Sequence, residues 1–369
     1  MTDPRYTPLR ERHEALGASF TDFGGWAMPV RYSSDLAEHH AVRTTAGLFD
    51  ISHMAEFFVE GEDAGEYLDY ALAGRVSTMA VGKAKYSLVL DENGGIVDDV
   101  IVYRLGDERF LVIANAGNRE PVAAALADRL EKRAVGVVDA TDDFSLIAVQ
   151  GPRARAVLEA TDRLEDFDHP LDELKYYAAV AASFDGHPVL IARTGYTGED
   201  GYELLVPNAH AGALWDALLA AGEPIGLVPA GLAARDTLRL EAGMPLYGHE
   251  LSLDIVPAQA GLGRAVASDK DDFVGRAGLS ALVATDSPVL VGLVSEGRRA
   301  GRAGYAVMDA DGPVGEITSG ALSPTLGHPI AMAFVAPALS APGTELFIDV
   351  RGTRIPATVT ALPFYRRTK

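Results

Sequence analysis

The chain has 369 residues, of which 48% are hydrophobic and 23% charged, a composition typical of a globular protein with more than one domain. The net charge of −20 argues against a nucleic-acid partner, and the absence of cysteine excludes disulfides, thiol nucleophiles and thiolate metal sites. Because no apolar run approaches the roughly twenty residues of a membrane span and the N-terminus lacks a secretory signal, we expect no membrane association and a cytoplasmic protein.

The first part of the chain alternates short helices and strands. Its patterns predict helices at 8–17 and 35–46, a glycine loop at 23–30 and one strand over 48–60. A helix near 63–73 leads to a hairpin with strands at 87–90 and 96–103. Further elements are expected as strands at 110–114, 146–149, 177–184, 188–192 and 202–206, and as helices at 120–133, 153–160, 209–221 and 229–242.

The sequence pattern changes from Pro288 onward, where short β-rich runs alternate with Gly and Pro turns. These runs cover 289–294, 306–308, 330–335, 345–350 and 355–359. We therefore expect a main region over 1–280 and a C-terminal all-β domain, a small barrel, over 285–369.

The hairpin carries two adjacent carboxylates, Asp98 and Asp99, inside an apolar strand. Successive side chains of a strand point to opposite faces, so whichever face is buried takes a carboxylate with it. A buried carboxylate needs hydrogen-bond donors or a raised pKa. The strand pattern does not choose between the two residues, and a strand end or edge open to water is the alternative.

Common catalytic signatures are absent. There is no P-loop, no G-x-G-x-x-G, no H-E-x-x-H and no G-x-S-x-G, which disfavours nucleotide-dependent, zinc and serine-hydrolase chemistry. His39 and His40 lie on a predicted helix and are interpreted as surface or capping residues. Glu203, like Asp99, is a carboxylate that leads into an apolar strand segment. An exposed strand position is the alternative interpretation of Glu203. Arg235 and Arg239 share a helix face, and pairing with Asp236 or Glu241 in the same helix is the simpler interpretation of each.

Five segments in register resemble the T-protein of the glycine cleavage system, the aminomethyltransferase family. They are Asp50-Ile-Ser-His-Met54, Tyr86 with Gly94-Gly-Ile-Val-Asp-Asp-Val-Ile-Val102, Arg193-Thr-Gly-Tyr-Thr-Gly-Glu-Asp-Gly-Tyr-Glu203, Ala234-Arg-Asp-Thr-Leu-Arg-Leu-Glu241 and Ser323-Pro-Thr-Leu-Gly327. The resemblance runs from about residue 7 to Arg366. Gln259 and Arg264 depart from it, standing where Glu and an aromatic residue are expected, and we assign the departures to packing rather than to chemistry.

The resemblance implies an α+β fold, with a folate-binding region of two interleaved lobes followed by the barrel. It implies transfer of an aminomethyl group from lipoylated H-protein to the co-substrate tetrahydrofolate, giving 5,10-methylenetetrahydrofolate, ammonia and dihydrolipoyl H-protein. No metal takes part. By similarity Asp99 is the catalytic carboxylate and Glu203 grips the pterin. The other folate-binding residues implied are Met54, Tyr86, Asn115, Tyr177, Tyr196, Arg235 and Arg366.

Two alternatives remain within the resemblance. One is another folate-dependent one-carbon transferase or demethylase, although the oxidising relatives carry a flavin domain and no dinucleotide motif is present here. The other is a non-catalytic folate-binding protein, whose Cys-containing loop this chain lacks. The basic cluster Arg298, Arg299 and Arg302 could meet H-protein, but a solvated charged loop is the simpler interpretation.

Overall fold

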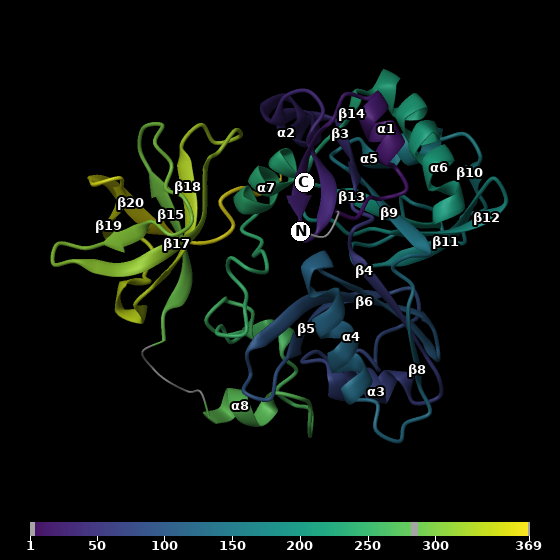
Figure 1. Cartoon of the computed structure of the whole chain (residues 1–369), viewed down its shortest axis with the longest axis horizontal. Helices are drawn as coiled ribbons and strands as arrows, with labels where there is room; N and C mark the ends of the chain where they lie inside the picture. The colour runs from purple at the N-terminus through teal and green to yellow at the C-terminus, as the bar shows by residue number, and fades with distance from the viewer. Residues whose placement is uncertain (1–3, 282–286, 368–369) are drawn as a thin grey trace.

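The computed structural model describes residues 4–281 and 287–367, which form three lobes (Figure 1). Two lobes are sheets covered by helices, and the third is a closed barrel. The chain begins the first sheet, leaves it to build the second, and then returns to complete the first. This arrangement confirms the expected α+β fold with two interleaved lobes and an all-β barrel. The expected boundary between residues 280 and 285 falls on residues 282–286, which lie outside the described residues.

The first lobe is a seven-stranded sheet in the order β10-β11-β12-β13-β9-β3-β14. Its strands are β3 (Ala46–Asp50), β9 (Phe144–Gln150), β10 (Leu164–Glu165), β11 (Ala179–Phe184), β12 (His187–Ala192), β13 (Gly201–Pro207) and β14 (Leu227–Pro229). Its helices are α1 (Arg10–Ala15), α2 (Asp35–Thr44), α5 (Ala154–Ala160) and α6 (Asn208–Gly222). Apolar side chains of α5 and α6, including the fully buried Trp215, pack on one face of this sheet.

The second lobe is a five-stranded sheet in the order β5-β6-β7-β4-β8. Its elements are β4 (Ala55–Glu60), β5 (Ala84–Leu90), β6 (Ile96–Gly106), β7 (Arg109–Ala114) and β8 (Gly136–Asp139), with helices α3 (Ala64–Ala71) and α4 (Arg119–Asp128). The two helices form one core with one face of the sheet. The opposite face packs against the first lobe through Tyr103, Leu111 and Ile113. Both faces of this sheet are therefore buried at its centre.

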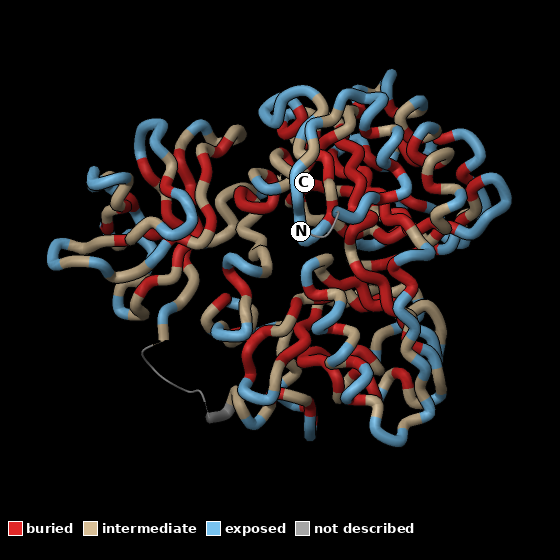
Figure 2. Tube along the Cα trace, viewed as in Figure 1, coloured by how far each residue is buried: buried red, intermediate tan, exposed pale blue. Residues whose placement is uncertain are grey.

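The barrel closes in the order β15-β18-β17-β16-β19-β20. Its strands are β15 (Val289–Ser295), β16 (Ala306–Met308), β17 (Pro313–Leu322), β18 (Pro329–Val335), β19 (Glu345–Val350) and β20 (Thr353–Thr360). Buried residues run through the strands of all three lobes (Figure 2). Helix α7 (Leu232–Glu241) lies between the barrel and the first lobe, and its Leu240 packs on Ile330 and Met332 of the barrel. Helix α8 (Arg276–Ala281) is the last element described before the barrel.

A charged network, which we call the junction, joins α2, α7 and the barrel. It consists of His39, Arg43, Glu199, Glu241, Ser323 and Thr325. The fully buried Glu241 accepts hydrogen bonds from Ser323 Oγ, from Thr325 N at 3.0 Å and from Thr325 Oγ1 at 2.7 Å. It also pairs with Arg43 at 2.8 Å and with His39 at 3.2 Å. His39 is therefore a buried structural residue, and its interpretation as a surface or capping residue is wrong.

Two local predictions are also wrong, and one long strand was missed. The expected loop at 23–30 is a hairpin of β1 (Ser19–Phe23) and β2 (Trp26–Arg31), in which Gly24 and Gly25 supply only the two-residue turn, at φ 60° and 83°. The single strand expected over 48–60 is split between the two sheets. Asp50 Oδ1 accepts from Ser52 N at 2.9 Å and turns the chain after β3. The long barrel strand β17 was not predicted at all. Within the described part of the chain, no helix is long and apolar enough to cross a membrane.

Candidate active site

A cavity of about 280 Å³ lies where the two sheet lobes meet the segment 244–262. Every residue predicted for the site except Arg366 lines it: Met54, Tyr86, Asp99, Asn115, Tyr177, Tyr196, Glu203 and Arg235. Arg366 is exposed and is not among the lining residues. Its assignment to the folate tail stays a prediction.

Strand β6 presents Asp98 and Asp99 to opposite faces of the second sheet. Asp98 is fully buried on the side of α4, where it accepts hydrogen bonds from Asn115 N at 2.8 Å, Asn115 Nδ2 at 2.8 Å and Asn118 Nδ2 at 2.6 Å. Asp99 lines the cavity and accepts from Asn115 Nδ2 at 2.8 Å and from the Tyr86 hydroxyl at 3.1 Å. The strand-edge alternative does not apply, because β6 lies between β5 and β7.

Both carboxyls are held in a poorly solvated place. Burial raises the pKa of Asp98 to about 7, and the neighbouring charge of Asp99 adds to this, against the hydrogen bonds from Asn115 and Asn118. Burial also raises the pKa of Asp99, against the hydrogen bonds from Tyr86 and Asn115. A carboxyl at a cavity wall whose pKa is raised, as that of Asp99 is, is suited to proton transfer.

Glu203 reaches the cavity from β13. Its Oε2 accepts hydrogen bonds from the Thr194 hydroxyl and, at 3.4 Å, from the Tyr103 hydroxyl. No hydrogen bond to Oε1 is found among the described residues. Burial raises the pKa of Glu203, opposed by Thr194, the Arg235 charge and Tyr103. One carboxylate oxygen is thus available to a ligand that can donate N–H groups.

Arg235 reaches the cavity from the first turns of α7. Its guanidinium lies 4.8 Å from the centre of the Tyr196 ring, and burial lowers its pKa. Among the described residues no carboxylate lies within ion-pair distance of it. Arg239 differs, because it pairs with Asp236 at 2.8 Å and with Glu250 at 3.1 Å. The simpler interpretation, pairing within the helix, therefore holds for Arg239 and not for Arg235.

The tyrosines form much of the remaining wall. The Tyr196 hydroxyl donates to the carbonyl of Pro245, which fastens the segment 244–262 to the loop after β12. Tyr177 has a φ of 58°, a left-handed conformation that a bulky residue adopts at a cost of about 1–2 kcal/mol. Its N–H donates to Arg193 O at 3.0 Å, and its carbonyl accepts from Ala84 N at 2.9 Å. These bonds hold the strained residue between the two sheets.

Two family models divide the chain between them. Residues 9–270 match the GCVT N-terminal domain, and residues 289–366 match the glycine cleavage T-protein C-terminal barrel domain. The chain belongs to the glycine cleavage T-protein family. The resemblance stated from the five sequence segments is therefore confirmed.

Full-length relatives within the T-protein family bear the name aminomethyltransferase. The protein of Cutibacterium acnes is 58% identical and that of Saccharopolyspora erythraea 53% identical, each alignment covering all of both chains. Among solved structures, the glycine cleavage system aminomethyltransferase T of Bartonella henselae matches with a TM-score of 0.91 and 39% identity, covering 99% of each chain.

Sequence reasoning missed several wall residues of this T-protein-family cavity. They are Phe23, Ile51, His53, Val100, Ile101, Tyr103, Ile113, Leu146, Gly195, Met244, Pro245, Leu246, Tyr247 and Leu262. Ile101 and Tyr103 share the strand face of Asp99, so the alternation that placed Asp99 could have placed them. The segment from Met244 to Tyr247 has no regular pattern, and nothing local indicated that it would cover the cavity.

The two departures from the family pattern lie outside the cavity wall. Gln259 accepts from Val256 N at 3.1 Å and donates to Pro288 O at 3.1 Å, which joins the 256–262 turns to the start of the barrel. Arg264 lies in a short 3-10 turn, Gly263–Ala265, and is exposed. The contacts of Gln259 agree with an effect on packing, and the assignment of Arg264 to packing stays a prediction.

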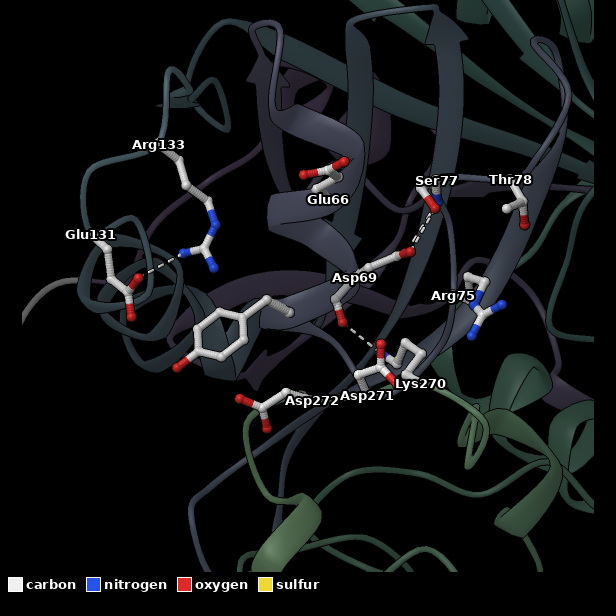
Figure 3. Close-up of a pocket in the computed structure, with 11 residues that line it drawn as sticks. Glu66, Asp69, Arg75, Ser77, Thr78, Glu131, Arg133, Lys270, Asp271 and Asp272 are labelled. Atoms are coloured by element: carbon white, nitrogen blue, oxygen red, sulfur yellow. Dashed lines mark hydrogen bonds and ion pairs between the residues drawn. The ribbon is translucent and has the colours of Figure 1, made fainter.

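A second hollow, of about 620 Å³, lies beside α3 on the other side of the second sheet (Figure 3). Its buried Lys270 donates from Nζ to the carbonyls of Asp69, Leu72 and Gly74 at 2.5 to 3.0 Å. Asp69 in turn accepts from Val76 N, Ser77 N and Ser77 Oγ. These two charged groups hold the chain after α3, so we place the chemistry in the first cavity. No group of His, Asp and Glu suited to a metal ion occurs in the described ranges.

Proposed function

We propose that this chain transfers the aminomethyl group of lipoylated H-protein to tetrahydrofolate, with the 280 Å³ cavity as its active site. The products are 5,10-methylenetetrahydrofolate, ammonia and dihydrolipoyl H-protein, the tetrahydrofolate-dependent step of glycine breakdown. Full-length similarity to proteins named aminomethyltransferase supports the reaction. The observation that carries the assignment to this cavity is the half-buried Asp99 carboxyl, held at its wall by Asn115 and Tyr86.

The residues of the cavity fit a reduced folate. Glu203 has an oxygen free to accept from the N–H and NH₂ groups of a pterin, and charge-assisted hydrogen bonds of this kind are strong. The rings of Tyr86, Tyr177 and Tyr196 offer the amphipathic surface that a flat heterocycle needs. Arg235 is a half-buried cation without a carboxylate partner among the described residues, which suits an anionic part of the ligand.

Asp99 supplies the acid–base function. Tetrahydrofolate, once bound, supplies the nitrogens that take up the one-carbon unit. The Asp99 carboxylate orients the reacting nitrogen and stabilises cationic character near it as ammonia leaves. Tyr86 and Asn115 hold the carboxyl in place by donating to its two oxygens. The Asn115 amide donates to both Asp98 and Asp99, which fixes the orientation of that amide.

The site of action that we propose is the cytoplasm, on the basis of the cysteine-free composition. Fractionation of cells, with the protein detected in the soluble cytoplasmic fraction, tests this location.

Ammonia release tests the function. Purified protein, tetrahydrofolate and aminomethyl-loaded H-protein should release ammonia, and Asp99→Asn should lower kcat by about 10²–10⁴-fold, the usual contribution of a positioned acid or base. Tetrahydrofolate affinity, measured by titration calorimetry, should stay within about threefold of the parent because Glu203 and Arg235 are untouched. Binding of tetrahydrofolate without turnover of H-protein would instead favour the demethylase or the non-catalytic folate-binding alternative.

A further inference from the structure

The side chain of Asn115 makes an unusual pair of contacts. Its Nδ2 group carries two hydrogens, and it lies 2.8 Å from Asp98 Oδ1 and 2.8 Å from Asp99 Oδ1. One amide is therefore shared by two carboxyls that belong to adjacent residues and point to opposite faces of the sheet. The Asn115 backbone N–H adds a third link, to Asp98 Oδ2 at 2.8 Å.

Asp98 itself does not line the cavity. It is fully buried, and every hydrogen bond described for it comes from an N–H donor of Asn115 or Asn118. These donors favour the ionised form of Asp98, whereas burial and the neighbouring Asp99 disfavour it. The chain of contacts runs Asn118, Asp98, Asn115, Asp99, Tyr86, so a change of charge at Asp98 reaches the cavity through one amide.

We propose that Asp98 is a positioning residue for aminomethyl transfer, acting on Asp99 through the side-chain amide of Asn115. The inference rests on the proposed function and deepens it. Asp98 fixes the amide that orients the Asp99 carboxyl, and its charge opposes ionisation of Asp99. Carboxyls coupled in this way gain and lose protons as a pair.

The other ionisable groups around the pair do not replace this coupling. The groups that face it from β5 and the surrounding loops are the hydroxyls of Tyr86, Tyr177, Tyr196 and Tyr247. Burial raises the pKa of each of these tyrosines, so all stay neutral at working pH. The cation at the start of α4, Arg119, is paired with Asp139 and Asp142. Asp98 is thus the carboxyl hydrogen-bonded to the same amide as Asp99.

The test compares Asp98→Asn with the matched variant Asp69→Asn. Asp69 is also an aspartate that accepts three local hydrogen bonds in the second lobe, but it lies beside the other hollow (Figure 3). Ammonia release is measured from pH 5 to pH 9 at saturating tetrahydrofolate and aminomethyl-loaded H-protein. We expect Asp98→Asn to lower kcat about tenfold and to move the acid limb of the kcat profile down by about one pH unit. Asp69→Asn should leave the midpoint of the acid limb of the kcat profile unchanged.

An unchanged midpoint in a folded Asp98→Asn protein, or an equal shift in Asp69→Asn, overturns the inference. If Asp98→Asn does not fold, carboxyl ¹³C NMR of the parent protein labelled at aspartate decides the matter. The inference predicts that Asp98 and Asp99 titrate in two shared steps, and independent single-step titrations contradict it. A parent protein that shows the shared steps but releases no ammonia would leave the coupling intact and refute the proposed function.

Discussion

The junction and the cavity both bury charged side chains, but they complete the hydrogen bonding of those side chains to different extents. At the junction, both oxygens of Glu241 have several donors, and Arg43 bonds to Glu241, to Glu199 and to the carbonyl of Thr197. In the cavity, the hydrogen bonds described for Glu203 all go to one oxygen, and Arg235 has no carboxylate partner in the described ranges. The junction is complete as the chain folds, whereas the cavity needs a ligand to be complete.

The pKa values of the two glutamates reflect this difference. Burial would raise the pKa of Glu241, but His39, Ser323 and Arg43 lower it to about 2. For Glu203, burial outweighs Thr194, Arg235 and Tyr103, and the pKa is raised. An acid whose pKa is lowered on folding stabilises the folded chain. An acid whose pKa is raised destabilises it, and at a cavity wall such a residue indicates a binding site. Variants can separate these two roles.

The largest effect is expected from Glu241→Gln at the junction. A glutamine can accept from Ser323 and Thr325, but its amide would face the guanidinium of Arg43, which then loses its nearest anion. Breaking a buried pair by changing one partner costs about 3–5 kcal/mol. Urea unfolding followed by circular dichroism measures the loss. Glu14→Gln, which breaks the exposed pair of Arg10 and Glu14, is the control and should leave the free energy of unfolding nearly unchanged.

A loss of unfolding free energy below about 1 kcal/mol in Glu241→Gln would mean that the hydrogen bonds and ion pairs of Glu241 contribute little to stability. The contrast between the junction and the cavity would then not hold.

The pH dependence of stability should show opposite slopes for the junction carboxyl Glu241 and for Asp98, which lies behind the cavity wall and bonds to the same amide as Asp99. The pKa of Glu241 is about 2 in the folded chain and near 4.5 in the unfolded one, so its stabilisation is present above pH 4.5 and is lost as pH falls, by about 3 kcal/mol. The pKa of Asp98 is raised from 3.8 to about 7, so its ionisation costs stability as pH rises through that range, by up to about 4 kcal/mol.

Unfolding free energies at about pH 3, 5 and 7 test this pattern in the parent protein, in Glu241→Gln and in Asp98→Asn. Glu241→Gln should flatten the acid side and Asp98→Asn the neutral side. If the unfolding free energy depended on pH in the same way in all three proteins, neither Glu241 nor Asp98 would be the source of the slope assigned to it.

The next effect in size concerns the ligand. Glu203→Gln should weaken tetrahydrofolate binding about 10–100-fold, because a charged acceptor worth about 1.5–3 kcal/mol is replaced by an amide. Folding stability should not fall, since a half-buried, incompletely paired carboxylate is removed. Titration calorimetry measures the affinity. Folded Glu241→Gln protein is the cross-control and should bind within about threefold of the parent, because the junction is a separate region. Unchanged affinity in Glu203→Gln would remove this residue from the pterin site.

Sequence patterns predicted the cavity better than the junction, for a physical reason. Alternation along 96–103 places one carboxylate on each face of a strand, and the family segments assign Asp99 and Glu203. The wall from Met244 to Tyr247 and the burial of His39 depend on side chains that meet only after folding; His39 and Thr325, for example, are 286 residues apart and hydrogen-bond at 2.8 Å. Local patterns also could not show that a short polar turn at Ser52 divides one apparent strand between two sheets.

Glu56 is a third kind of buried acid and gives the smallest expected effect. It is fully buried in β4, and within the described chain neither of its carboxylate oxygens has a hydrogen-bond partner. Burial, with Asp139 and Asp142 nearby, raises its pKa well above the usual range. The folded chain therefore binds this proton more tightly than the unfolded chain does, and the cost to folding stability grows as pH rises above the unfolded pKa. Glu56→Gln should be about 1 kcal/mol more stable than the parent at pH 7, equal to it at about pH 4, and unchanged in turnover.

Urea unfolding at the two pH values and the ammonia assay check this prediction for Glu56→Gln. A loss of turnover would give Glu56 a part in the reaction, because Ile113, which lies opposite it on β7, and Met54, two residues before it, line the cavity. The incompletely paired region would then include Glu56 as well as the cavity wall.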